Sequence, residues 1–224
     1  LNMEEEGVLI GSLSEYIGVN MPPNVVKLPD RHLLWGDKQA EYLKNLYPEI
    51  KDNFFKVGNP RLHLWKNRYY GFYDLLADDI KKEFGEFVLM PSNFPYYTNS
   101  RHVKEMLAIT GFLEKSENTK IYEENFKIVE FLFKEFLKAA KEISLKGIKV
   151  IFRPHPSDSI SKIQEYFSGY DNIIVRSDHD VAPWILASRA VIHNCCTTGL
   201  EAAFMKKNTV AYTPNSVSQY KLNE

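Results

Sequence analysis

The sequence predicts an α/β protein whose C-terminal part is a doubly wound parallel sheet. From residue 86 onward, short apolar segments alternate with longer segments of helical spacing. The short segments are continuous apolar runs, which is typical of parallel strands that are buried on both faces. The motifs G-x-G-x-x-G and G-x-x-x-x-G-K-[ST] do not occur, so the sequence has neither a dinucleotide fingerprint nor a P-loop.

The elements of this part follow from its periodicity. The longest expected helix has an apolar stripe that indicates core packing, formed by Phe126, Val129, Phe133, Phe136 and Leu137. Strands are expected at 87–90, 148–152, 173–175, 190–193 and 209–212, and helices at 122–145, 160–167, 182–187 and 199–206.

The N-terminal part of the sequence is predicted to form a smaller β-α-β unit. Strands are expected at 32–35 and 54–57, and a helix at 37–46 with Asp37 as its N-cap. We therefore divide the chain into the end of an incomplete N-terminal domain (1–62), a linker with a helix (63–85) and a second α/β domain (86–224). Because the chain begins with leucine and ends in a polar stretch soon after a strand, we expect it to be a piece of a longer protein.

Composition excludes several classes of function. The chain has 28 basic and 29 acidic residues, so no overall positive field attracts nucleic acid. Its two cysteines are adjacent, which argues against a disulfide between them and fits a cytoplasmic location. No apolar run approaches the roughly 20 residues of a membrane span, so any membrane association is expected to be peripheral.

Polar residues follow four of the expected strands. Ser92 and Asn93 follow one, His155 another, the Ser177-Asp178 pair a third and the Thr197-Thr198 pair a fourth. Ligands of open parallel sheets bind beyond the carboxyl ends of the strands. These loops therefore predict a binding site at one edge of the sheet.

The segment 192–204 is the most informative of these loops. A buried strand there enters a helix through small hydroxylated residues, where unpaired N–H groups and the positive end of the helix dipole favour an anion. Thr197, Thr198 and Gly199 can therefore hold a phosphate, and Glu201 can accept hydrogen bonds from a ribose. The alternative is a threonine N-cap followed by a solvated glutamate, which needs no ligand.

Three short motifs resemble those of bacterial transferases that use CMP-activated sugars, including sialyltransferases and Kdo transferases of GT-B type. They are the acidic Glu5-Glu6-Gly7, the His155-Pro156 step and the Thr197-Thr198 pair, in the same order as in those enzymes. The resemblance implies a GT-B-like fold, with 1–62 on the acceptor side and 86–224 binding the nucleotide sugar.

A closer likeness extends over nearly the whole chain. The chain resembles the bacterial surface-carbohydrate biosynthesis family, whose members are regarded as glycosyltransferases and are longer than this chain. The matching motifs, besides the acidic opening, are Trp35-Gly36 with Gln39-Ala40, Gly58-Asn59-Pro60-Arg61, Ser92-Asn93-Phe94, Arg153-Pro154-His155-Pro156 and the run from His193 to Ala202.

The resemblance assigns roles to individual residues. Glu5 would be the general base that faces the acceptor hydroxyl, and His155 would bind or protonate the leaving phosphate. The alternatives are a solvated acidic N-terminus for Glu5, a structural histidine for His155 and a buried ion-pair partner for Arg153. The expected donor-nucleotide residues are Ser92, Asn93, Arg153, His155, Pro156, Thr197, Thr198, Gly199 and Glu201.

Neither a metal nor a cofactor is expected. His193 lies beside Cys195 and Cys196, but the sequence has no second pair of ligands at zinc-site spacing. The cysteines are instead interpreted as small residues packed at the end of a strand. A CMP leaving group carries one phosphate, which helix N–H groups, threonine hydroxyls and an imidazole can stabilise without a metal.

The function expected from these features is transfer of a sugar from a nucleotide donor, with CMP-sugar favoured, to a cell-surface polysaccharide such as lipopolysaccharide or capsule, or to a lipid-linked acceptor. The enzyme would be cytoplasmic, with peripheral association at the inner membrane left open. Two alternatives remain: a teichoic-acid-type glycerol or ribitol phosphotransferase, and a non-catalytic subunit that binds a nucleotide sugar.

Overall fold

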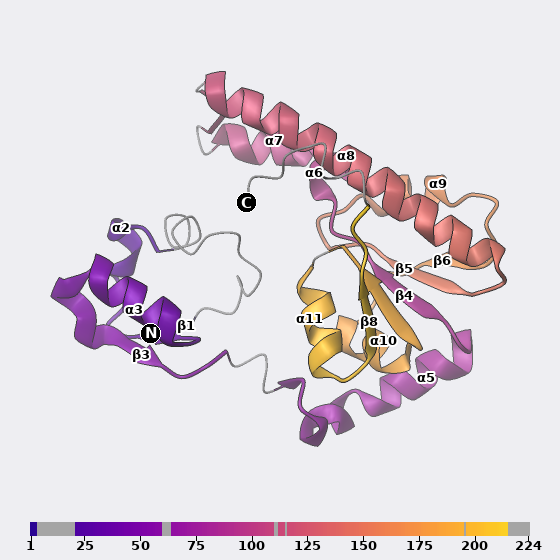
Figure 1. The fold of residues 1–224 in the computed structure, drawn as a ribbon, viewed down its shortest axis with the longest axis horizontal. Helices are drawn as coiled ribbons and strands as arrows, with labels where there is room; N and C mark the ends of the chain where they lie inside the picture. Colours follow the sequence, from indigo (N-terminus) through magenta and orange to yellow (C-terminus); the bar gives the residue numbers. More distant parts are fainter. Residues whose placement is uncertain (4–20, 60–63, 110–111, 115, 195, 215–224) are drawn as a thin grey trace. The chain divides into compact units, whose positions relative to one another are not determined.

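The chain forms two compact units, which divide after Tyr70 (Figure 1). The computed structural model describes residues 1–3, 21–59, 64–109, 112–114, 116–194 and 196–214. Each unit contains a parallel sheet covered by helices, so the α/β class is confirmed. Two successive α/β units of this kind are the components of the expected GT-B-like fold.

The first unit has a three-stranded parallel sheet in the order β1-β2-β3. Its core consists of apolar side chains from the sheet and the helices packed on it, among them Leu34, Leu43 and Phe54. The β-α-β unit expected from the sequence is therefore present. Its elements are β1 (Asn2–Met3), α2 (Pro23–Val26), β2 (His32–Leu34), α3 (Asp37–Leu46), η1 (Pro48–Asn53) and β3 (Phe54–Lys56).

Two polar residues of this unit have structural roles. His32 is buried; its Nε2 donates to the Val26 carbonyl at 2.8 Å, and its Nδ1 accepts from the Asn2 amide at 3.2 Å. The prediction of Asp37 as N-cap is wrong, because Gly36 occupies that position and Asp37 is the first helical residue. The Asp37 carboxylate instead pairs with Lys56 at 2.5 Å.

The second unit has a five-stranded parallel sheet in the order β6-β5-β4-β7-β8. From the central strand β4, the chain adds β5 and β6 on one side of the sheet and then β7 and β8 on the other side. This is the doubly wound topology. Every strand of the prediction is present, with ends shifted by at most two residues. The strands are β4 (Val88–Pro91), β5 (Val150–Arg153), β6 (Ile173–Val175), β7 (Ala190–His193) and β8 (Asn208–Ala211).

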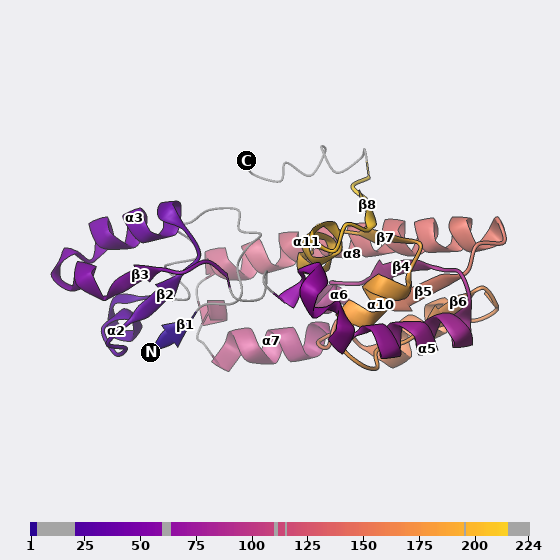
Figure 2. The same ribbon diagram turned by 90° about the horizontal axis from the view of Figure 1, so that it is seen from below.

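Helices cover both faces of this sheet, with α8 on one face and α5 and α10 on the other (Figure 2). Alternate strand residues explain why both faces are apolar: Val150 and Phe152 join the α8 core, whereas the buried Ile151 points to the other face. The division between the units falls within η2 (Asn67–Phe72). The helices of the second unit are α5 (Asp74–Phe84), α6 (Pro95–Thr98), α7 (Ser100–Ile109), η3 (Phe112–Glu114), α8 (Ser116–Leu145), α9 (Ile160–Tyr166), α10 (Val181–Ala187) and α11 (Thr197–Phe204).

The long helix α8 confirms the expected apolar stripe. Phe133, Phe136 and Leu137 are buried in the core, and Val129 packs against them. The helix begins at Ser116 rather than at residue 122, and the preceding α6 and α7 were not predicted. The structure also places α5 within the second unit, where it packs against α10, so the segment 63–85 contributes more than a linker.

Among the described residues, no helix combines the length and the apolar character needed to cross a bilayer.

Candidate functional site

The loops expected to form a site lie at one edge of the five-stranded sheet. All neighbouring strands are parallel, so the segments after Pro91, Arg153, Val175 and His193 lie at the same edge. The chain reverses its winding direction between β4 and β7, and such a switch point is where open α/β sheets bind ligands. The loop after β4 and the start of α11 therefore flank this position.

A buried carboxylate joins the loops after β4 and β5. Asp158 Oδ2 accepts from the Ser92 hydroxyl at 2.7 Å and from the His155 N–H at 3.0 Å. Its Oδ1 accepts from the Thr98 hydroxyl at 2.8 Å and from the Phe94 N–H at 3.2 Å. Asp158 and Ser92 are both buried, so these bonds fix the two loops relative to one another.

His155 is held at the surface by a tight turn. The Asp158 N–H donates to the His155 carbonyl at 2.8 Å, with Pro156 at the second position of the turn, where proline is favoured. The Ser157 N–H donates to His155 Nδ1 at 3.1 Å, which leaves Nε2 as the ring nitrogen available to a ligand. The imidazole is exposed, as is the neighbouring side chain of Asn93. This arrangement suits a group that contacts a ligand rather than the core.

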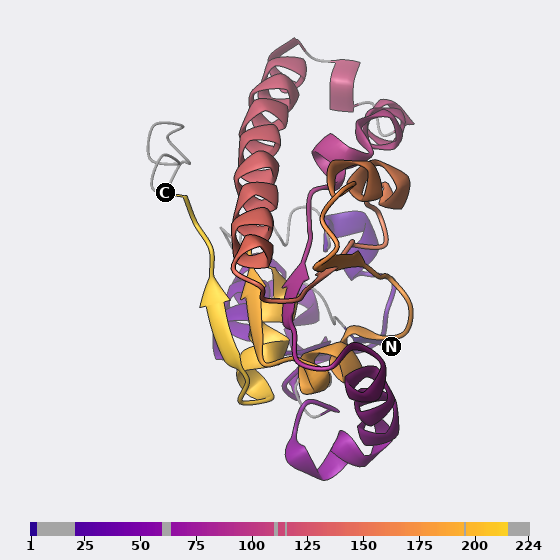
Figure 3. The same ribbon diagram turned by 90° about the vertical axis from the view of Figure 1, so that its right-hand side faces the viewer.

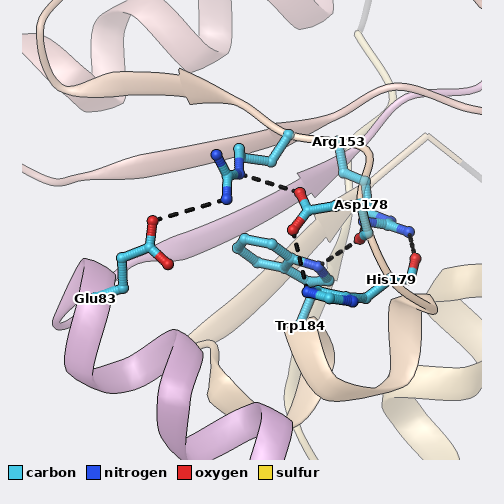
Figure 4. Close-up of polar contacts among 6 residues, drawn as sticks. Glu83, Arg153, Asp178, His179 and Trp184 are labelled. Carbon is cyan, nitrogen blue, oxygen red and sulfur yellow. Dashed lines mark hydrogen bonds and ion pairs between the residues drawn. The ribbon is translucent and has the colours of Figure 1, made fainter.

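Arg153 holds the loop that follows β6 (Figure 4). One guanidinium nitrogen donates to the Asp178 carbonyl at 2.6 Å and the other donates to the His179 carbonyl. The Trp184 indole N–H also donates to the Asp178 carbonyl, at 3.0 Å. The backbone of His179 is left-handed, with φ of 58°, so the arginine stabilises a turn that a non-glycine residue rarely adopts.

Acidic groups surround this arginine. Burial lowers the pKa of Arg153, and the neighbouring Asp178, Asp180 and Glu201 carboxylates act in the opposite direction. Glu201 is buried on α11, with 4% of its surface exposed. The alternative of a solvated glutamate is therefore not what the structure shows.

A second ionic group borders the same loop. Asp178 also pairs through its carboxylate with Arg176 at 3.1 Å and with His179 at 3.4 Å, and Arg176 lies 3.7 Å from Glu83 of α5 (Figure 4). These charges connect the loop after β6 to α5. The ion pairs of this loop are therefore made by Arg176, whereas Arg153, for which an ion pair was the alternative role, donates to backbone carbonyls.

The N-terminus of α11 has no oxygen cap. Its N-cap residue is Cys196 rather than a threonine, and no side-chain hydrogen bond caps the helix. Burial raises the pKa of the Cys196 thiol, although the N–H groups of Gly199 and Thr198 beside the sulfur act in the opposite direction. A thiol is a weak acceptor. Thr197 and Thr198, both half-buried, therefore begin a helix whose positive end remains suited to an anion.

A histidine at the end of β7 explains the glycine of α11. A Cβ atom on Gly199 would lie 2.2 Å from Cε1 and 2.3 Å from Nδ1 of His193, closer than real contacts allow. Glycine at this position therefore lets the imidazole lie against the first turn of the helix. Burial lowers the pKa of His193, which favours the neutral ring.

Two polar atoms near this helix have no hydrogen-bond partner among the described residues. They are Nδ1 of His193 and Oδ1 of Asn194, which are buried although the two residues are partly exposed. Unpaired buried polar atoms are costly, and they concentrate at sites that bind ligands or ordered water. They lie on the segment that joins β7 to α11.

The structure brings together most of the residues expected at the site. Thr197, Thr198, Gly199 and Glu201 lie in α11, and Ser92, Arg153 and His155 lie at the ends of β4 and β5. The hydroxyl of Ser92, however, is already bonded to Asp158, and Pro156 serves the turn. Glu5 and Cys195 lie outside the described residues. Within the described part of the chain, no group of His, Cys, Asp and Glu side chains could hold a metal ion.

Sequence reasoning missed Asp158, Thr98 and His193 as structural parts of the site. A signal for Asp158 exists: an aspartate that follows a proline by two residues is typical of a turn whose side chain bonds nearby backbone. Thr98 lies on the unpredicted helix α6 and had no such signal. The contact between His193 and Gly199 depends on how β7 meets α11, which the local sequence does not reveal.

No protein-family model matches the sequence, and no curated protein is similar to it in sequence. The chain is similar to a solved variant of the wall teichoic acid polymerase TagF soaked with CDPG, with 17% identity, a TM-score of 0.48, and coverage of 88% of this chain and 41% of that one. For another TagF structure the values are 15%, 0.47, 89% and 44%.

A third solved structure is the Methanocaldococcus jannaschii UDP-GlcNAc 2-epimerase in complex with UDP-GlcNAc and UDP. Its identity is 13%, its TM-score is 0.40, and the match covers 89% of this chain and 63% of that chain. The chain thus spans less than two thirds of each of these proteins. Similarity at this level assigns neither an activity nor a residue role to this chain.

Proposed function

We propose that the second unit binds the nucleotide of an activated sugar at the carboxyl edge of its sheet, and that the whole protein transfers the sugar to a glycan or lipid-linked acceptor. The observation that supports this most is the N-terminus of α11, which has no oxygen cap and lies at the point where the sheet reverses its winding. A nucleotide phosphate supplies the negative charge that this helix end favours.

The phosphate would lie between two loops. The strands β5 and β7 are separated only by β4, so the loops that follow them start about 10 Å apart. A phosphate at the N–H groups and hydroxyls of Thr197 and Thr198 could thus also receive a hydrogen bond from His155 Nε2. Asp158 would fix the position of His155 without touching the ligand.

The leaving group explains how these residues would assist the reaction. When the bond between the sugar and the CMP phosphate breaks, negative charge grows on the phosphate, and donors already in place stabilise that charge. His155 can supply a hydrogen bond or a proton at this point. Glu5 remains our proposal for the base that takes the proton of the acceptor hydroxyl, in an inverting reaction.

A teichoic-acid-type phosphotransferase would use the same donors. Transfer of glycerol phosphate or ribitol phosphate from a CDP-linked donor also releases CMP, so the phosphate site serves both reactions. The two differ in the bond formed, which is glycosidic in one case and a phosphodiester in the other. Analysis of the product made by the full-length protein separates them. A non-catalytic subunit would bind nucleotide and form neither bond.

The proposed site is tested by nucleotide affinity. Calorimetric titration with CMP, CDP, UDP and GDP should show binding, with CMP or CDP preferred. Replacing both Thr197 and Thr198 with alanine should weaken binding by about 1–3 kcal/mol, or roughly 5- to 150-fold, because hydroxyl groups that contact a charged phosphate are lost.

Thr209→Ala is the matched control, because Thr209 lies on β8 and its hydroxyl donates to the Lys207 carbonyl at 2.9 Å. This variant should bind nucleotide as the unmodified chain does. If the double variant folds and keeps full affinity, the two threonines do not bind the phosphate and the proposal loses its main support.

The acceptor side is tested in the full-length protein. Glu5→Gln should abolish transfer and leave nucleotide affinity unchanged, whereas His155→Ala should reduce both. Full activity of Glu5→Gln would contradict the role proposed for Glu5. We further propose a cytoplasmic enzyme, with any membrane association peripheral at the inner face of the inner membrane.

A further inference from the structure

A hollow lies at the edge of the five-stranded sheet opposite the proposed nucleotide site. Its volume is about 420 Å³, within the range of roughly 300–1,000 Å³ typical of small-molecule sites. Three of its residues closely precede strands: Glu86 before β4, Arg189 before β7 and Lys207 before β8. In Figure 3 the strands run upward, and α5 lies at the end of the sheet where they begin. The hollow is therefore separate from the proposed nucleotide site.

The hollow is formed by the ends of two packed helices. Lys81 and Gly85 come from the end of α5, and Ala187 and Ser188 come from the end of α10. Gly85 has a φ of 69°, a positive value that glycine adopts readily, where the chain turns from α5 toward β4. Small residues at these helix ends keep the hollow open, and longer charged side chains surround it.

Positive charge exceeds negative charge in the lining. Lys81, Arg189 and Lys207 carry positive charge, and Glu86 is the only acidic residue among those that line the hollow. Two of the cations have distant partners: Arg189 lies 3.6 Å from Glu86, and Lys81 lies 3.6 Å from Asp78 of its own helix. These side chains are well exposed, and ion pairs of this kind contribute little.

Lys207 is the group whose charge is least compensated. Its ammonium donates to the Ser188 carbonyl at 3.1 Å, and no carboxylate of the described residues pairs with it. Burial lowers the pKa of Lys207, and the positive charge of Lys81 acts in the same direction. Partly buried charges are normally paired, because desolvation without a counter-charge is costly.

The position of Lys207 is set by the backbone. The Lys206 N–H donates to the Ala203 carbonyl at 3.0 Å, and the Lys207 N–H donates to the Ala202 carbonyl at 2.9 Å. These two bonds end α11 in a Schellman motif. Lys207 is therefore held at this edge by the end of the helix and is not a freely moving surface lysine.

We infer that this hollow binds a phosphate-bearing small molecule, with the phosphate between Lys207, Lys81 and Arg189. The phosphate supplies negative charge that the lining lacks, and the remaining volume accommodates the group attached to it. The phosphate could be a monoester of a free metabolite or a diester within a polymer. Both present anionic oxygens to the three cations, with up to two negative charges in the monoester and one in the diester.

The test is titration of the full chain with inorganic phosphate, glucose 6-phosphate and dimethyl phosphate, followed by calorimetry and by amide shifts in NMR spectra. We expect binding with shifts at Gly85, Arg189 and Lys207. Lys207→Met and Lys81→Gln should each weaken binding about tenfold, as expected for the loss of one charged contact. Preference for glucose 6-phosphate would identify a monoester, and equal binding of dimethyl phosphate would identify a diester.

Lys82→Gln is the matched control, because Lys82 neighbours Lys81 but pairs with Asp79 at 3.0 Å and is 77% exposed. This variant should bind as the unmodified chain does. Circular dichroism establishes that each variant is folded, and Lys81→Gln keeps the test decisive if Lys207→Met unfolds. The proposal is overturned if none of the three probes binds at millimolar concentration, if Lys82→Gln loses as much affinity as Lys81→Gln, or if the shifts lie at Thr197 and Thr198 and not at Gly85, Arg189 and Lys207.

Discussion

Replacing Asp158 with asparagine tests the network that joins the loops after β4 and β5. Each carboxylate oxygen accepts from one hydroxyl and one backbone N–H: Oδ2 from Ser92 and His155, and Oδ1 from Thr98 and Phe94. In the variant, one oxygen becomes an NH₂ group. A hydroxyl can rotate to accept from that group, but a backbone N–H cannot.

The expected loss of stability follows from the four hydrogen bonds that Asp158 accepts. One buried N–H without an acceptor costs about 1–3 kcal/mol, and the remaining bonds lose the strength that a charged acceptor gives. Part of this loss is offset because a charge no longer has to be buried. We therefore expect Asp158→Asn to lower the free energy of unfolding by about 2–4 kcal/mol.

Urea unfolding followed by tryptophan fluorescence measures this change. The matched control is Asp171→Asn at an exposed position, which should stay within about 0.5 kcal/mol of the unmodified chain. Asp158→Asn should also weaken nucleotide binding, since the position of His155 depends on Asp158. A change below about 1 kcal/mol, comparable to the control, would show that the four bonds do not fix the loops.

Three further predictions concern α11 and its surroundings. Gly199→Ala should lower the free energy of unfolding by about 1–2 kcal/mol, since the new methyl group meets the His193 ring. A double-mutant cycle measures this contact, and the loss of stability should vanish when His193 is also replaced with alanine. Lys206→Gly should raise the free energy of unfolding by roughly 0.5–1 kcal/mol, because Lys206 is left-handed with φ of 58°; no gain in urea unfolding would contradict this. The pKa of His193 is below its ordinary 6.5, so the folded state binds its proton less readily than the unfolded state. The contribution of the neutral His193 ring to stability is therefore present above pH 6.5 and is lost as the pH falls through the folded pKa. Unfolding experiments at several pH values measure this dependence, and His193→Gln should abolish it.

The strands of the second unit could be predicted well because each is a short apolar run between turn residues. The segments 173–175 and 190–193 have the same ends in the prediction and in the structure. The helix α7 was missed although Val103, Met106 and Leu107 recur at helical spacing, and none of its side chains is buried. The short α6 was missed because Pro95 in a polar segment indicates a loop.

The position of the candidate site in the fold could be predicted from the sequence. The contacts within the site could be predicted less well. The carboxyl-end rule for parallel strands placed Ser92, His155 and Thr197 at the same edge from sequence alone. The buried state of Glu201 and the use of the Ser92 hydroxyl by Asp158 depend on packing between distant segments. Local sequence contains no signal for such partners, so the prediction treated both residues as free to bind a ligand.

The proposed function requires a nucleotide to bind at the carboxyl edge of the five-stranded sheet. Amide shifts of the ¹⁵N-labelled chain during titration with CMP test whether it does. We predict that the largest shifts occur at Thr197, Thr198 and His155. Shifts confined to the residues that precede the strands, with Thr197 and Thr198 unmoved, would contradict it.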